Sequence, residues 1–142
     1  MIGDLLRWLV WCVMKWTAAL SVGNAALDEP IQQLFSVAER LRQAICEGFG
    51  KVVVGKILDE LIQYTVGHFE REERLMLRIE YPDYLVHKAA HDRLINKVQY
   101  LQHCFQRGAL TQTDALDQFI DQHLSEHLIS FDRALAAAAM RA

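Results

Sequence analysis

Pairs of side chains that can bind a metal ion recur at helical spacing in this sequence of 142 residues. His68 and Glu72 lie four residues apart in HFEREE, and His87 and His91 lie four residues apart in HKAAH. Residues four apart share one face of an α-helix. Both pairs fall on the apolar face of their segment, where burying polar groups costs free energy. These positions therefore need a chemical explanation.

A third set of such residues lies near the C-terminus. His123 and His127 are four residues apart, and Asp132 follows His127 by five. On a straight α-helix a step of five residues turns a side chain by roughly 140° from its partner. Either Asp132 reaches back toward His127, or the helix is locally widened between them.

The combination of imidazoles and carboxylates indicates a metal site. A single histidine on an apolar face is most simply a packed core residue with a hydrogen-bond partner. Several imidazoles and two carboxylates together would be costly to desolvate unless a cation collects them. A cation keeps the carboxylates ionised and occupies the imidazole lone pairs. Histidine and carboxylate ligands without a thiolate suit iron, and also zinc or manganese. Two carboxylates from different helices favour a site for two metal ions.

Amphipathic helices are the elements expected to position these side chains. Asp28 is the expected N-cap of the first helix, with Pro30 in its first turn. The second helix ends before Pro82, because the residue that precedes a proline is disfavoured in a helix. Apolar residues recur with the helical period in four segments. They span about residues 28–48, 52–79, 83–106 and 113–138.

Four helices with short connections predict an all-α fold. The expected architecture is an antiparallel, up-and-down four-helix bundle, because short connections join antiparallel neighbours. No strand pattern competes with the helical one. The bundle is expected to form a single domain over residues 28–142, and residues 1–27 form an N-terminal arm.

Composition and charge exclude several classes of protein. The net charge is -3, with acidic and basic residues interspersed, so no basic patch indicates a nucleic-acid partner. Three cysteines without a CxxC pair predict a reduced, cytoplasmic protein. The apolar segment LLRWLVWCVM is shorter than the roughly 20 residues of a membrane span, so it is expected to belong to the arm. A membrane anchor and a start at Met14 are the alternatives.

Four segments in order resemble the hemerythrin family, and within it the bacteriohemerythrins. The resemblance runs from about Trp16 to Leu135 with consistent spacing. The segments are KWTAALSVGNAALDE, YTVGHFEREERLM, YPDYLVHKAAH and HLISFDRAL. Myohemerythrin is an up-and-down bundle, and the family binds O2 reversibly at a non-haem di-iron centre. The resemblance therefore implies an oxygen carrier, store or sensor.

The resemblance also implies which residues hold the metal. Three imidazoles would hold the first iron, one would hold the second, and two carboxylates would bridge the pair. In that order these residues are His87, His91 and His127, then His68, then Glu72 and Asp132. The cofactor would be two non-haem iron ions with an oxo or hydroxo bridge. O2 or another small diatomic would bind the second iron. An apolar pocket lining would come from Ile31, Leu34, Phe69 and Leu128.

The sequence departs from the family pattern in two places. Ile31 stands where the family has a histidine ligand of the second iron, and His123 stands where it usually has a tryptophan. Three outcomes are open. His123 replaces the missing ligand, water fills the gap and leaves a weaker or more oxidisable site, or only the three-histidine position holds a metal.

Three functions are also open. The first is an O2-binding di-iron protein with a ligand-deficient second iron, which is expected not to be an enzyme. The second is an iron protein that reacts with O2, peroxide or NO. The third is a metal-poor interaction module. A sensor would further need a signalling partner that the sequence does not name.

Overall fold

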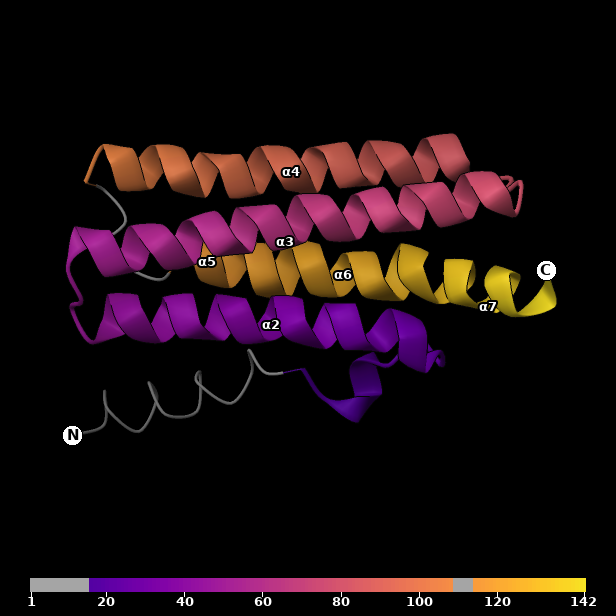
Figure 1. The fold of residues 1–142 in the computed structure, drawn as a ribbon, viewed down its shortest axis with the longest axis horizontal. Coiled ribbons are helices and arrows are strands. Elements are labelled where there is room, and N and C mark those ends of the chain that lie inside the picture. The colour runs from indigo at the N-terminus through magenta and orange to yellow at the C-terminus, as the bar shows by residue number, and fades with distance from the viewer. Residues whose placement is uncertain (1–15, 109–113) are drawn as a thin grey trace.

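The computed structural model is an all-helical bundle, as the sequence predicts (Figure 1). It describes residues 16–108 and 114–142, apart from the side chains of 114 and 121–123. The bundle consists of four helical rods packed side by side. Three of them are single long helices, and the fourth is a continuous series of shorter helical elements. The three long helices are α2 (Ala25–Cys46), α3 (Lys51–Arg78) and α4 (Tyr84–Gln106). A short 3-10 helix, η1 (Ala18–Leu20), precedes them. The expected four-helix bundle is confirmed.

The fourth rod alternates between α-helix and π-helix. Two of its segments, η2 and η3, are π-helical. Each of them locally widens a rod that is otherwise a continuous α-helix. In order, the elements are α5 (Asp114–Gln118), η2 (Phe119–Leu124), α6 (Ser125–His127), η3 (Leu128–Asp132) and α7 (Arg133–Arg141). The rod lies between α2 and α3 in the view of Figure 1.

The start of α2 differs from the sequence expectation. Asn24, not Asp28, is the N-cap, and its side-chain oxygen accepts a hydrogen bond from the Ala26 N–H at 3.0 Å. Asp28 instead lies in the first turn and accepts from Ser21 Oγ at 2.6 Å and from the Val22 N–H at 2.8 Å. Both oxygens of the Asp28 carboxylate accept hydrogen bonds from the segment that precedes the helix, so Asp28 does not cap it.

Pro30 lies inside α2 and not in its first turn as expected. The helix begins earlier than the sequence indicated, so Pro30 falls in the second turn. A proline there removes a backbone N–H that would otherwise bond within the helix.

Apolar faces of all four rods meet in one core. Fully buried leucines and isoleucines come from every rod, and each large apolar side chain stabilises the fold by about 1.5–3 kcal/mol. They include Leu34, Leu41, Leu58, Leu61, Leu101, Leu116 and Ile120. This packing fixes the rotation of each helix about its axis, and so decides which polar residues point inward.

A buried ion pair joins α2 to the fourth rod. Arg42 Nε donates to Asp117 Oδ1 at 3.0 Å. Burial by itself would lower the pKa of Arg42, but the hydrogen bond and the charge of Asp117 outweigh burial and raise the pKa. The guanidinium therefore stays charged inside the bundle.

The described part of the arm contacts the bundle at two points. Val22 is buried in the core, and Arg133 of α7 donates to the Ala19 carbonyl. The predicted role of residues 5–14 lies outside the described residues. Within the described ranges, no helix is both long enough and apolar enough to cross a membrane.

Candidate metal centre

Five donor side chains from three rods converge inside the bundle. One donor atom from each lies within 4.8 Å of the others, and all five residues are buried. We call them the five-donor cluster: Glu72 of α3, His87 and His91 of α4, His127 of α6 and Asp132 of η3. No other cluster of three or more such donors occurs in the described part of the chain. All five were candidates from the sequence.

The distances within the five-donor cluster suit ligands of one shared ion. His87 Nε2 lies 3.1 Å from His127 Nε2, 3.1 Å from Asp132 Oδ1 and 3.4 Å from Glu72 Oε2. His91 Nε2 lies 2.9 Å from Glu72 Oε2. Ligands bound at about 2.1 Å and at right angles are ~3.0 Å apart. The three imidazoles turn the same nitrogen, Nε2, toward one point, so the residues fit a bound metal ion.

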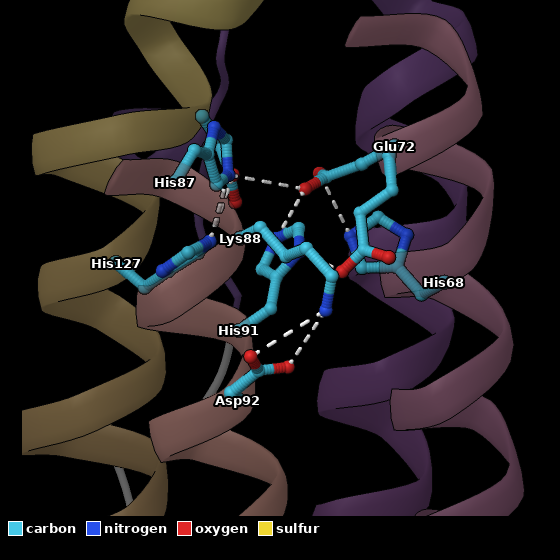
Figure 2. Close-up of polar contacts among 9 residues, drawn as sticks. His68, Glu72, His87, Lys88, His91, Asp92 and His127 are labelled. Carbon is cyan, nitrogen blue, oxygen red and sulfur yellow. Dashed lines mark hydrogen bonds and ion pairs between the residues drawn. The ribbon is translucent and has the colours of Figure 1, made fainter. Parts of the chain in front are cut away.

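His68 lies on the other side of Glu72 (Figure 2). Its Nε2 is 3.1 Å from Glu72 Oε1, whereas Oε2 of the same carboxylate faces His87 and His91. The two oxygens of Glu72 thus point to different imidazoles. A carboxylate that bridges two metal ions requires this arrangement. His68 does not belong to the five-donor cluster, and a metal ion beside it would be a second one.

The four expected pocket-lining residues are all buried in the apolar core. They are Ile31, Leu34, Phe69 and Leu128. Ile31 is 1% exposed and carries no donor atom. The side chain of His123, the suggested substitute ligand, lies outside the described residues.

The π-helical segment η3 explains how His127 and Asp132, five residues apart, lie on the same side of the fourth rod. In a π-helix the backbone bonds join residues five apart, so these residues are brought onto one side. His127 Nε2 and Asp132 Oδ1 are 3.1 Å apart. Of the two alternatives raised by the sequence, the structure has the widened helix.

A deletion can test this role of η3. A π-helical turn is an α-helical turn with one extra residue, so removing exposed Ser130 is expected to leave Leu135 and Ala136 facing the core. We expect the free energy of unfolding to change by less than about 1.5 kcal/mol, measured by chemical denaturation. Removing exposed Asn96 from α4 is the control. It turns Val98 away from the core by roughly 100°, and a loss above about 4 kcal/mol is expected. Equal losses in the two deletions would contradict the role assigned to η3.

Opposite charges stabilise each other within the site. Burial by itself would raise the pKa of Glu72, but hydrogen bonds from His68, His87 and His91 outweigh burial and hold the pKa well below its ordinary value. Burial would lower the pKa of His87, yet its hydrogen bonds to Asp132 and Glu72 raise the pKa to about 9. The Glu72 carboxylate is therefore ionised, and it attracts positive charge into this buried site.

Aromatic rings hold the imidazoles in place. Phe69 stacks on His91 with ring centroids 4.0 Å apart and an angle of 5° between the planes. Phe131 stacks on His127 at 5.1 Å and 25°. Sequence reasoning did not assign Phe131 to the site. Its position one residue before Asp132 was the only available signal. These apolar rings also keep water from the donor atoms.

Fold and site together define a class of protein: an all-α bundle that gathers histidines and carboxylates for a cation. The hemerythrin HHE cation binding domain matches residues 23–138, and the chain belongs to the hemerythrin family.

Two relatives and one solved structure illustrate the likeness. The bacteriohemerythrin of Methylococcus capsulatus is 33% identical over 124 residues, covering 85% of this chain and 92% of that protein. A hemerythrin-like protein of Naegleria gruberi is 29% identical over 118 residues, covering 83% of this chain and 87% of that protein. The crystal structure of a wild-type hemerythrin matches with a TM-score of 0.79 and 30% identity, covering 89% of this chain and 98% of that one.

Proposed function

We propose that this protein binds O2 reversibly at a non-haem di-iron centre. His87, His91 and His127 hold the first iron, and His68 holds the second. Glu72 and Asp132 bridge the two ions. The observation that carries the proposal is the five-donor cluster, together with the His68 imidazole on the far oxygen of Glu72. Membership of the hemerythrin family, which binds O2 at such a centre, supports it.

The chain's own residues prepare the site for this task. When bound, an iron pair supplies an open coordination position and the electrons that reversible O2 binding requires. The buried carboxylates would neutralise the ions, and the three converging imidazoles would fix the position of the first one. Phe69 and the surrounding core residues exclude water and anions, which favours a small neutral ligand.

We further propose that the second iron is deficient in protein ligands. Ile31 is buried and cannot coordinate, so this iron would be held by the His68 imidazole and the two carboxylates, Glu72 and Asp132. Its binding is then weaker than that of the first iron. An imidazole supplied by His123 is the alternative, and replacing His123 with leucine tests it. An unchanged affinity for the second iron would exclude His123 as a ligand.

The decisive experiment loads the purified protein with Fe(II) under anaerobic conditions. We expect up to two irons per chain, the second bound more weakly, and a near-ultraviolet charge-transfer band on adding O2 that disappears when O2 is removed. Two bound irons without a reversible spectral change would contradict O2 carriage. An iron content near zero would instead select a metal-poor interaction module.

A second function is favoured by the same buried isoleucine. With one imidazole missing, the second iron has more than one position free for exogenous ligands, and such an iron would react with O2, peroxide or NO instead of holding O2. Turnover of peroxide by the iron-loaded protein, measured as peroxide consumed per iron, distinguishes this function from O2 carriage.

The cellular setting stays a prediction. We infer a cytoplasmic location from the cysteine pattern, and Cys46 and Cys104 are free thiols in the structure. A sensory role would require a partner protein that responds to the state of the iron site.

A further inference from the structure

Two acidic residues contact His91 from opposite sides. Its Nε2 lies 2.9 Å from Glu72 Oε2 inside the five-donor cluster. Its Nδ1 lies 3.0 Å from Glu73 Oε1, and the Glu73 side chain is 19% exposed. Adjacent glutamates on α3 thus have different positions. Glu72 points into the cluster, whereas Glu73 contacts His91 from the outer side.

The histidines of the cluster differ in this outer contact. The Nδ1 atom of His87 is buried and has no hydrogen-bond partner. His91, by contrast, has a carboxylate acceptor on Nδ1 and a stacked Phe69 ring on its face. An imidazole held at Nδ1 by a carboxylate keeps its proton there and presents the Nε2 lone pair to a metal. His91 is therefore the better oriented of these two ligands.

The neighbouring cation does not compete for this contact. Lys88 interacts electrostatically with Glu73. Its Nζ, however, donates to the two carboxylate oxygens of Asp92 at 3.1 and 3.4 Å (Figure 2). This pairing leaves Glu73 as the acceptor for the His91 N–H.

We propose that Glu73 is a positioning residue of the metal centre. It fixes the orientation and tautomer of His91 and increases the donor strength of the imidazole. The inference rests on the proposed function only in taking His91 to be a metal ligand. In sequence Glu73 is one more acidic residue on a helix, and the only signal for it is the doubled glutamate of HFEREE.

Cobalt(II) binding to the full chain tests the inference without oxygen chemistry. Competition with a chelator gives the dissociation constant, and the visible absorption bands report the ligand field. We expect Glu73→Ala to weaken Co(II) binding 10–100-fold and to change the bands, because loss of such an outer partner has effects of about that size. Glu73→Gln keeps an oxygen acceptor and is expected to recover part of the affinity.

Glu70→Ala is the matched control, since Glu70 is an exposed acid on the same helix. Its Co(II) affinity is expected to stay within twofold of the parent. The inference is overturned if Glu73→Ala also stays within twofold, or if it lowers only the unfolding midpoint while the affinity and bands are unchanged. An iron-loaded protein without an O2 response would contradict the proposed function and leave the Co(II) result standing.

Discussion

Replacing Ile31 with histidine is expected to strengthen binding of the second metal ion about 100-fold. Four ligands of structural zinc together contribute about 10–16 kcal/mol, which is roughly 3 kcal/mol for each. One tenfold step corresponds to about 1.4 kcal/mol. The new imidazole would supply the ligand that we propose the second iron lacks. Anaerobic Fe(II) titration with metal analysis measures the effect, and any peroxide turnover by the parent protein is expected to fall in the variant.

In the metal-free protein, the Ile31→His substitution is expected to have the opposite effect and to lower the stability of the fold. Ile31 is 1% exposed, so an imidazole there is buried without an assigned partner. We expect the free energy of unfolding to fall by about 2 kcal/mol and to recover when iron is added. Ile31→Asn is the control, because it is destabilised similarly but gains no strong ligand. Equal responses of the two variants to iron would show that position 31 does not face the second ion.

Removing His87 is expected to have the largest effect on the first metal ion. Its Nε2 lies within 3.4 Å of Glu72 Oε2 and within 3.1 Å of His127 Nε2 and Asp132 Oδ1, so it is central to the five-donor cluster. His87→Ala should weaken binding of the first metal by about 100-fold or more. The O2-dependent absorption band should disappear with it. Metal titration and circular dichroism on the same samples separate loss of the site from loss of the fold.

His103→Ala provides the control for this substitution. His103 lies on α4 as well, but it is exposed and lies outside the five-donor cluster. Metal content and the absorption band are expected to be unchanged. An effect as large as that of His87→Ala would mean that the histidines of α4 act through helix stability, and the assigned site would then be wrong.

Much of the fold follows from local pattern. The apolar period of 3.6 residues predicts the four rods, and the observed bounds of α3 and α4 lie within one residue of the expected ones. The start of α2 was less predictable. Asn24 and Asp28 are both good N-caps by residue type. Only the contacts of Asp28 with Ser21 and Val22 exclude it from that role.

Sequence by itself determined which side chains were candidates for the centre, because residues four apart share a helical face in any α-helix. It also raised the problem of the five-residue step to Asp132, but a sequence does not choose between a reaching side chain and a widened helix. The tertiary structure has the widened helix, the π-helical segment η3. The reason is that the fourth rod must place both His127 and Asp132 against His87 of α4. The tertiary structure also determines that Glu72 and Glu73 contact different nitrogens of His91. Adjacent residues point about 100° apart, and only packing against α4 puts one in the cluster and the other behind His91.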